Sequence, residues 1–218
     1  MFYDTRTGDH GLPHDPFKAC VVPRPIGWIT SMNEAGSVNL APYSFFNGVA
    51  GDPPCVMFAP GGRKADGPPD GSKDSLANVE RTGEFVCNVV TWDLREAMNV
   101  TSAPAPAGVD EAAVAGLEMV PSRLVRPPRA KASPVHLECR YLQTVDLPSA
   151  VPGTRNAVVF GQVIGIHIDE SVLTNGKVDI AKLKPVSRLG YMDYCVVEDV
   201  FAMARPAWPV KPTSDAAD

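Results

Sequence analysis

The stretch that decides the fold is residues 26–47, which read IGWITSMNEAGSVNLAPYSFFN. Its first part, Ile26 to Met32, is rich in apolar and β-branched side chains, which favour an extended strand. Asn33 to Gly36 supply the residue types of a tight turn. Because a second apolar run starts at Val38, the stretch predicts two neighbouring strands joined by this turn.

Short apolar runs elsewhere in the chain predict that strands outnumber helices. The 22 prolines are scattered, which disfavours long helices. Strand spacing and turns together indicate an antiparallel barrel with helical insertions. Further strands are expected at Cys55 to Ala59, Phe85 to Val90, Val135 to Val145, Ala157 to Ile168 and Tyr194 to Ala202. Short helices are expected at Lys73 to Thr82 (capped by Ser72 and ended by Gly83), at Trp92 to Asn99 after Thr91, and around Glu111 to Ala115.

We expect residues 1–218 to form a single domain with two unusual segments. Residues 1–18 read as an irregular polar arm. Residues 101–134 form a Pro/Ala-rich excursion that is too long for an ordinary connection, so we expect it to be functional or to pack on a partner subunit. The Gly/Pro/Asp-rich residues from Arg63 to Ser72 predict an exposed loop.

Composition excludes several classes of protein. With 44% hydrophobic and 21% charged residues, the chain has the composition of an ordinary globular domain. Its net charge of −5 argues against a nucleic-acid binder, although a local basic pocket could still hold a phosphate. No apolar run is long enough to span a bilayer, and the first residues lack signal-peptide features, which predicts a cytoplasmic protein. Five widely spaced cysteines without a CxxC motif are expected to be buried free thiols.

Motifs for several common activities are missing from the sequence. The Gly-rich stretch from Gly61 to Ser75 lacks the spacing of a phosphate-binding P-loop, and no GxGxxG or GxSxG is present. His10 and His14 could join a metal site, but a solvated arm is the better interpretation. His136 and His167 lie in predicted strands, where a hydrogen-bonded structural imidazole is the default. We therefore assign no catalytic side chain and no metal ligand.

Two segments carry more specific chemistry. Hydroxyl, small and aromatic side chains from Gly27 to Ser31 and from Asn39 to Asn47 gather at a strand edge, which suits a flat heteroaromatic ring. The alternative is plain barrel core. The second segment, Ser72-Lys73-Asp74-Ser75 with Asn78, opens a helix, where free N–H groups and a lysine suit a terminal phosphate. An ordinary capped surface helix is an equally good interpretation of that segment alone.

Taken in order, these segments resemble the flavin-reductase-like family, the FMN-binding split barrels that include reductase components of two-component monooxygenases. The similarity runs from about Asp15 to Pro206, and the set is specific although no single piece is. It is carried by Val22–Ser31, Asn39–Phe46, Asp52–Pro54, Lys73–Val79, Gly83–Asn88 and Gly161–Val163.

The resemblance implies a mainly β, antiparallel Greek-key split β-barrel with short helical insertions. It implies a homodimer with FMN at the subunit interface, and an oxidoreductase that receives electrons from NAD(P)H. The implied contacts to the ring and ribityl chain are Trp28, Ile29, Thr30 and Ser31, with Ala41, Pro42, Tyr43, Ser44, Phe45 and Phe46 along the ring. Lys73, Asp74, Ser75 and Asn78 would surround the phosphate, and Arg188, Gly190 and Tyr191 would close the ring pocket.

The chain departs from the family pattern at one informative place. Short reductases of the family usually carry an Asp-His pair before the Gly-x-Val strand, associated with nicotinamide binding. Here the stretch from Gly153 to Phe160 has no histidine, so FMN binding is better supported than direct NAD(P)H oxidation. Open alternatives are a flavoprotein oxygenase or electron carrier acting on a small molecule, with a partner monooxygenase in some cases, a non-catalytic FMN-binding protein, and a structural barrel module.

Overall fold

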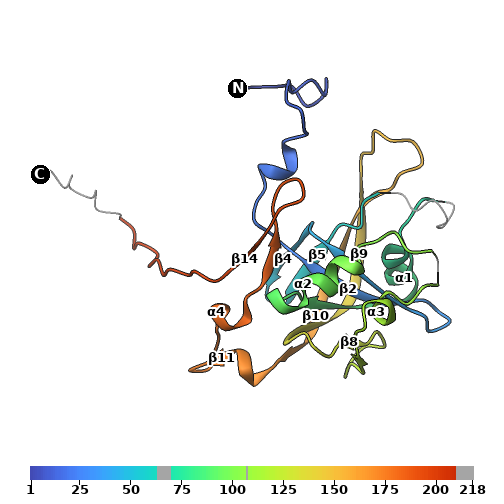
Figure 1. Ribbon diagram of the computed structural model, residues 1–218, viewed down its shortest axis with the longest axis vertical. Helices are drawn as coiled ribbons and strands as arrows, with labels where there is room; N and C mark the ends of the chain where they lie inside the picture. The colour runs from blue at the N-terminus through green and yellow to red at the C-terminus, as the bar shows by residue number, and fades with distance from the viewer. Residues whose placement is uncertain (63–69, 107, 210–218) are drawn as a thin grey trace, which may run out of the picture.

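The protein is built around one curled antiparallel sheet of seven strands. The computed structural model describes residues 1–62, 70–106 and 108–209 (Figure 1). The strand order is β3-β2-β6-β9-β10-β5-β4, and every pair is antiparallel. The strands are β2 (Gly27–Met32), β3 (Val38–Tyr43), β4 (Phe46–Gly51), β5 (Pro54–Phe58), β6 (Glu84–Val89), β9 (Val135–Leu147) and β10 (Asn156–Ile168).

The two edge strands of this sheet are consecutive in the chain. Only Ser44 and Phe45 separate the end of β3 from the start of β4, although the two strands lie at opposite edges. The sheet must therefore curl until its edges meet at one corner. This arrangement confirms the predicted mainly β, antiparallel split-barrel fold.

Smaller sheets and short helices surround the curled sheet. β1 (Arg24–Pro25), β13 (Val186–Arg188) and β14 (Tyr194–Val196) form a three-stranded sheet, whereas β7 (Met119–Val120) pairs with β8 (Arg129–Ala130) and β11 (Leu173–Thr174) with β12 (Lys177–Val178). The helices are α1 (Asp74–Thr82), α2 (Arg95–Val100), α3 (Glu111–Val114) and α4 (Ile180–Leu183), with 3₁₀ turns η1 (Phe17–Ala19), η2 (Trp92–Leu94) and η3 (Glu170–Val172). No helix of the described ranges has both the length and the hydropathy required to cross a membrane.

The predicted strands agree with the structure except at the C-terminal end. A strand was expected from Tyr194 to Ala202, but β14 stops at Val196. In the described chain β14 pairs with β13, which is three residues long, and the ladder is followed by one more hydrogen bond, from the Val197 N–H to the Pro185 carbonyl at 3.0 Å. Residues 198–209 are exposed, including Phe201 at 86%. The prediction of a long final strand is therefore wrong.

Helix α1 begins one residue later than predicted. Lys73, rather than Ser72, occupies the N-cap position, because the Ser72 hydroxyl donates to Asp70 Oδ2 at 2.8 Å instead. Gly83 ends the helix as expected: its φ of 75° is left-handed, and its N–H donates to the Val79 carbonyl. Thr91 precedes η2, but its side chain makes no capping hydrogen bond.

Two hydrophobic cores lie on opposite sides of β2 and β3. Ile29 and Tyr43 point into the first core with Phe58 and Phe85, whereas Trp28 points into the second. Successive strand residues face opposite sides, so β2 is buried on both faces. The second core is completed by residues of η2, α2, α3 and β8, among them Leu94, Met98, Ala112 and Ala130.

The excursion at 101–134 packs on its own chain through buried acceptors on the barrel. The fully buried Glu138 accepts from the backbone N–H groups of Arg123 (2.8 Å) and Leu124 (2.6 Å) and contacts His167 Nε2 at 2.5 Å. Asn88 Oδ1 accepts from the Ala130 N–H at 2.9 Å. The excursion thereby covers part of the second core.

The cysteine prediction is only partly correct. All five thiols are free, but only Cys87 and Cys139 are buried. Cys20 is exposed, and Cys55 and Cys195 are half-buried. Cys20 follows η1 in the N-terminal arm, and Cys195 belongs to the short β14, so neither lies in the strands that enclose a core.

Candidate functional site

The start of α1 meets the ends of β2 and β3 in a network of polar side chains. Ser75 Oγ accepts hydrogen bonds from Asn39 Nδ2 (2.8 Å) and from the Tyr43 hydroxyl (2.9 Å). Asn78 Nδ2, one turn later in α1, donates to Ser31 Oγ at 3.2 Å. The two segments that the sequence singled out are therefore in direct contact.

The network of Ser31, Asn39, Tyr43, Ser75 and Asn78 lies beneath the protein surface, and we call it the floor of the site. Ser31 and Ser75 are both fully buried, and burial raises the pKa of Tyr43, so its hydroxyl stays protonated and donates. Lys73 and Asp74, just before and at the first residue of α1, are half-buried above this floor. The hydrogen bonds beneath thus fix the helix start, while Lys73 and the first-turn N–H groups remain nearer the surface.

Lys73 carries a charge in a partly desolvated position. Its Nζ lies 5.8 Å from the centroid of the Tyr43 ring, and burial, followed by the positive charge of Lys18, lowers the pKa of Lys73. Within residues 1–62, 70–106 and 108–209, no carboxylate forms an ion pair with it. An anion at this position would offset both the desolvation and the repulsion from Lys18.

The predicted ring contacts in β2 lie inside the protein. Trp28, Ile29 and Thr30 are fully buried. Trp28 Nε1 donates to Thr101 Oγ1 at 2.8 Å, and Thr30 Oγ1 accepts from Asn88 Nδ2 at 2.9 Å. Because β2 pairs with both β3 and β6, its backbone groups are also engaged, so these three residues support the site from within the core.

The residues from Ala41 to Phe46 divide between the two faces of the sheet. Ala41 and Phe46 pack against the first core, and the Phe46 ring fills the space that a side chain at Gly27 would need, 2.5 Å from its Cβ position. Phe45 is 37% exposed and lies over the Arg24 guanidinium, 5.7 Å from ring centroid to Cζ. Pro42 and Ser44 face a cavity on the other side.

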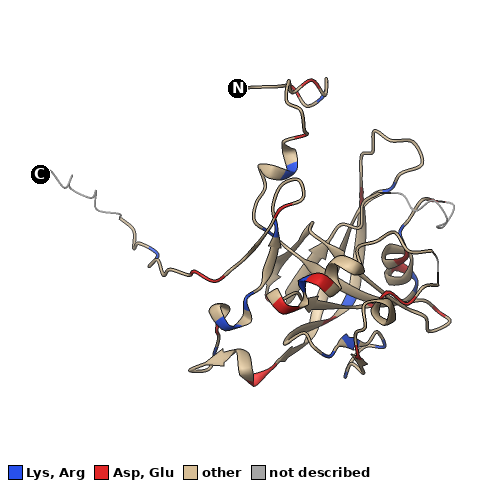
Figure 2. Ribbon diagram, in the orientation of Figure 1, with Lys and Arg blue, Asp and Glu red and all other residues tan. Residues whose placement is uncertain are grey.

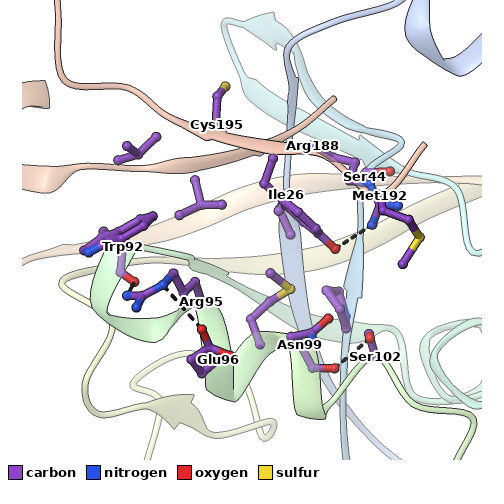
Figure 3. A pocket seen from close by; sticks show the side chains of 15 residues that line it. Ile26, Ser44, Trp92, Arg95, Glu96, Asn99, Ser102, Arg188, Met192 and Cys195 are labelled. Atoms are coloured by element: carbon purple, nitrogen blue, oxygen red, sulfur yellow. Dashed lines mark hydrogen bonds and ion pairs between the residues drawn. The ribbon is translucent and has the colours of Figure 1, made fainter. Parts of the chain in front are cut away.

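This cavity, of about 660 Å³, opens between α2, the end of β3 and the β13–β14 hairpin (Figure 3). Three predicted residues line it, namely Pro42, Ser44 and Arg188. Sequence analysis missed the rest, because they come from segments far apart in the chain. The most informative of these are Ile26, Trp92, Arg95, Glu96, Met98, Asn99, Val186, Met192 and Tyr194.

A signal for part of this wall was present in the sequence. Trp92 and Arg95 are three residues apart, which places them on one side of a helical turn. In the structure the Arg95 guanidinium lies 3.8 Å from the Trp92 ring centroid, and Trp92 is 45% exposed. A large aromatic residue exposed beside an arginine is a feature of binding surfaces rather than of ordinary helix exteriors.

Arginines also meet at the β1–β13 pair. Arg24 and Arg188 are directly opposed residues of these strands. Arg24 is buried and donates to the carbonyls of Lys18, Val21 and Leu189, while its Nε is buried and has no hydrogen-bond partner among the described residues. Burial, followed by the charge of Arg188, lowers the pKa of Arg24.

In the described chain, the side-chain contacts of Arg188 and Tyr191 are with each other, with Tyr194 and with His14, and not with the helix-start network. Arg188 Nη1 donates to the Tyr194 hydroxyl at 2.5 Å, its Nη2 donates to the Tyr191 carbonyl, and its guanidinium lies 4.5 Å from the Tyr194 ring centroid. The Tyr191 side chain is exposed and contacts the ring of His14 edge-on. Gly190 packs closely on Ala19, where a Cβ would approach to 2.5 Å.

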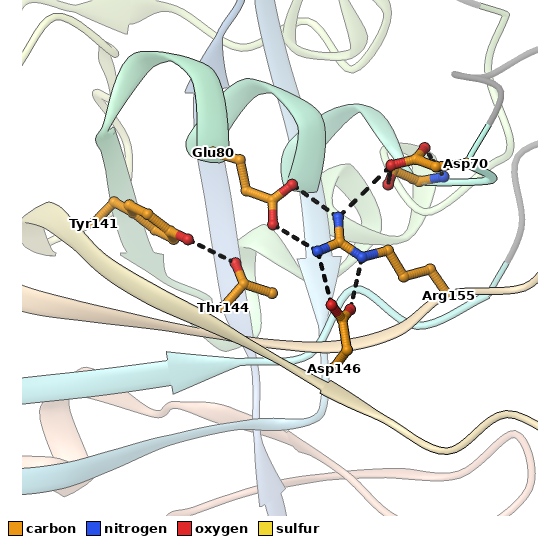
Figure 4. Close-up of polar contacts among 7 residues, drawn as sticks. Asp70, Glu80, Tyr141, Thr144, Asp146 and Arg155 are labelled. Atoms are coloured by element: carbon orange, nitrogen blue, oxygen red, sulfur yellow. Dashed lines mark hydrogen bonds and ion pairs between the residues drawn. The ribbon is translucent and has the colours of Figure 1, made fainter.

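A single arginine fastens α1 to the barrel (Figure 4). Arg155 makes paired contacts to Glu80 (2.8 and 2.9 Å) and to Asp146 (2.7 and 3.2 Å), and lies 3.7 Å from Asp70. Hydrogen bonds to Glu80 and then to Asp146 raise the pKa of Arg155. Asp70 in turn accepts from Ser72 directly before Lys73, so Arg155 connects the middle of α1 and the segment leading into it.

Apart from the arginines of β1 and β13, the charged residues of the described ranges are spread over the chain (Figure 2). His10 accepts from the Leu12 N–H within the arm, and no group of three metal-ligating side chains gathers among the described residues. The Gly-rich loop predicted around Arg63 to Ser72 falls largely on residues 63–69, outside the described ranges.

The fold and this site define a split-barrel protein with a lysine at the start of α1 and an open cavity on the other side of β3. The sequence matches the flavin reductase like domain over residues 19–192, and the chain belongs to that family. Flavin is accordingly the class of cofactor that its family supports.

Relatives and solved structures agree with this assignment. An uncharacterised protein of Deinococcus radiodurans is 39% identical over 195 residues, covering 86% of this chain and 82% of that protein. Nitrilotriacetate monooxygenase component B from Bacillus cereus superposes with a TM-score of 0.83 at 27% identity, covering 93% of this chain and 98% of that chain. The 2-nitrobenzoate 2-nitroreductase of Pseudomonas fluorescens superposes with a TM-score of 0.76 at 27% identity, covering 90% and 91%.

Proposed function

We propose that the chain is an FMN-dependent oxidoreductase, most simply an NAD(P)H:flavin oxidoreductase. The observation that carries this proposal is Lys73, a desolvated ammonium at the start of α1 above a fixed hydrogen-bonded floor. Family membership supports flavin, and this position supports the mononucleotide, because a terminal phosphate is the anion that a helix start and a lysine hold well.

The residues present fit FMN in distinct roles. Lys73 and the N–H groups of Asp74 and Ser75 would bind the phosphate, with Ser31 and Asn78 holding the helix start in place. The segment from Ala41 to Phe46 would lie along the ring, and Arg188 and Tyr191 would close the pocket. Bound flavin supplies hydride and electron transfer, so the chain itself needs to bind, orient and exclude water rather than supply a general base.

The cavity beside Pro42 and Ser44 is suited to the second reactant. Its volume of about 660 Å³ falls in the range of small-molecule sites, and it lies next to the segment proposed for the ring. An electron donor or a substrate entering there would reach that segment without displacing the helix-start network. The geometry thus supports two neighbouring sites, one for the cofactor and one for its reaction partner.

A homodimer is also proposed, with support from exposed apolar residues. Phe201, Met203 and Trp208 are more than 80% exposed on the described C-terminal stretch, at 86%, 82% and 89%. Exposed apolar side chains at this density are typical of surfaces that contact another chain. A second copy that covers them would also bring further residues near the cavity, as the family resemblance implies for FMN at a subunit interface.

A second candidate function follows from Arg155. It stands in the stretch where short reductases of the family usually have an Asp-His pair, and here it is fully occupied in the contacts to Glu80 and Asp146. Without that pair, direct use of NAD(P)H has less support, which favours an electron carrier or flavoprotein oxygenase. The similarity to a monooxygenase component B makes a partner oxygenase part of this alternative.

Steady-state oxidation of NADH and NADPH by the purified chain with added FMN separates these functions. Rapid turnover with either nicotinamide supports the reductase. Tight FMN binding without turnover rejects the reductase and supports electron carriage or a non-catalytic flavin-binding role. The nicotinamide with the higher kcat/KM then identifies the electron donor.

A further inference from the structure

We propose that the cavity between α2 and the β13–β14 hairpin binds a planar organic carboxylate whose charged group is held by Arg188. The inference rests on the proposed function, since it names the class of second substrate for the same flavin site. It is carried by the composition of the cavity walls and by the unusual charge environment of Arg188.

The cavity has apolar residues in its middle, Arg188 and Ser44 on one side, and Arg95, Glu96, Asn99 and Ser102 on the other (Figure 3). Ile26, Met98 and Val186 belong to the second core and present their outer surfaces to the cavity. Trp92 adds an aromatic ring on the α2 side, and Arg188 stands across from it with Ser44 (Figure 3). An apolar pocket with a few converging polar groups fits a molecule with an apolar body and one polar end.

Arg188 is a cation without a compensating anion. It faces Arg24 across the β1–β13 pair, and like charges on directly opposed residues destabilise a sheet. No carboxylate lies within ion-pair distance of either guanidinium in the part of the chain that the structure describes. A bound anion at Arg188 would supply the missing charge.

The geometry of Arg188 favours a carboxylate. A guanidinium has five N–H donors, and two groups, the Tyr194 hydroxyl and the Tyr191 carbonyl, accept from it in the described chain. The Tyr194 ring at 4.5 Å holds the guanidinium plane in place. A fixed guanidinium with free donors matches the two oxygens of a carboxylate, which it binds through paired hydrogen bonds.

The opposite wall carries an arginine that already has an acidic neighbour. Arg95 also lines the cavity, but its Nε lies 3.5 Å from Glu96 Oε1 and its Nη1 donates to the Trp92 carbonyl at 2.7 Å. Arg95 and Glu96 therefore offset one another, and Arg188 is left as the uncompensated charge. Among the described residues that line the cavity, Arg188 is therefore the cation available to one anionic group.

Calorimetric titration of the full chain, with and without FMN, tests the proposal with benzoate and its neutral analogue benzamide. We expect benzoate to bind at least tenfold more tightly than benzamide. Arg188→Gln should remove that preference. Arg188→Lys, which keeps the charge but loses the planar set of N–H donors, should retain part of it. Arg123→Gln, which removes an exposed arginine whose contacts are made by its backbone, should behave like the wild type.

Each other outcome has a definite meaning. Equal affinity of the wild type for benzoate and benzamide, or an unchanged preference in Arg188→Gln, overturns the inference. Tighter binding of AMP than of benzoate, lost in the same variant, assigns the position to a nucleotide phosphate and also overturns it. Flavin absorbance recorded in the same samples separates the two claims: without FMN binding the proposed function fails, whereas FMN binding without benzoate preference rejects only this inference.

Discussion

Arg24 and Arg188 are register partners of β1 and β13, and neither forms an ion pair with an acidic residue of the described chain. Opposed like charges cost stability in a sheet. Lys18 and Lys73 are a second pair of cations, and the charge of Lys18 contributes, after burial, to lowering the pKa of Lys73. In a chain of net charge −5, these uncompensated cations mark the side of the barrel at which we expect anionic ligands.

Replacing Lys73 by alanine is expected to weaken FMN binding at least tenfold. A charge-assisted contact to phosphate is worth about 1.5–3 kcal/mol, and 1.4 kcal/mol corresponds to a factor of ten. Fluorescence titration with FMN measures the effect, and riboflavin, which lacks the phosphate, should bind both proteins alike. Lys177→Ala, an exposed lysine of β12, is the matched control. Unchanged FMN affinity would remove Lys73 from the site.

Arg155→Ala is expected to lower the free energy of unfolding by about 1–3 kcal/mol. Its side chain is partly buried, and its loss leaves Glu80 and Asp146 close together without a cation. Urea denaturation measures the change, with Arg126→Ala as a control at an exposed arginine that uses only its backbone N–H. A denaturation midpoint equal to that of the wild type would show that the arginine does not fasten α1.

Gly161→Ala is expected to destabilise the first core by about 1–3 kcal/mol through overpacking. The new Cβ would lie 2.3 Å from Cζ of the fully buried Phe85 and 3.2 Å from the Arg140 carbonyl oxygen. Gly48→Ala is the control, because its Cβ would meet nothing within 4 Å. The double variant Gly161→Ala with Phe85→Leu should lose less free energy of unfolding than the sum of the losses of the two single variants. Losses that simply add would contradict the proposed clash.

Protein stability is expected to fall as the pH decreases from 6.5 toward 4, because of His136. Burial lowers the pKa of this imidazole to about 4 from an ordinary 6.5. Its Nε2 lies 2.9 Å from the Ala130 carbonyl, and the titratable groups around it are Arg129, Glu138 and His167.

The sign follows from the proton balance of the two states. Between pH 6.5 and 4 the unfolded chain protonates His136 and the folded chain does not, so stability is lost, on the order of 3 kcal/mol in total. Urea denaturation across this pH range measures the slope, and His136→Gln should make it shallower. An equally steep slope in the variant would assign the effect to other groups.

Much of the barrel could be predicted because its strands are continuous apolar runs bounded by turns. Cys55 to Ala59 is one example, since the corresponding strand β5 covers Pro54–Phe58. The final strand could not be predicted correctly, because its length depends on the three-residue partner β13, a non-local feature. The N-cap of α1 likewise depends on Asp70, which competes for the Ser72 hydroxyl.

The site was less accessible to sequence reasoning than the fold. Ser31, Tyr43, Ser75 and Asn78 were identified and do meet, because helix-start and strand-end positions have local signatures. The cavity was missed, since it is assembled from three distant segments around Ile26, Trp92 and Tyr194. Which face each strand residue occupies was also undetermined, because a strand buried on both sides shows no alternation of polar and apolar residues.

The most direct test is a calorimetric and spectroscopic titration of the purified chain with FMN, compared with riboflavin. Our account predicts a yellow complex with one FMN per chain, bound at least tenfold more tightly than riboflavin, because Lys73 and the start of α1 bind the phosphate. A protein that stays colourless and releases no heat with FMN would contradict it.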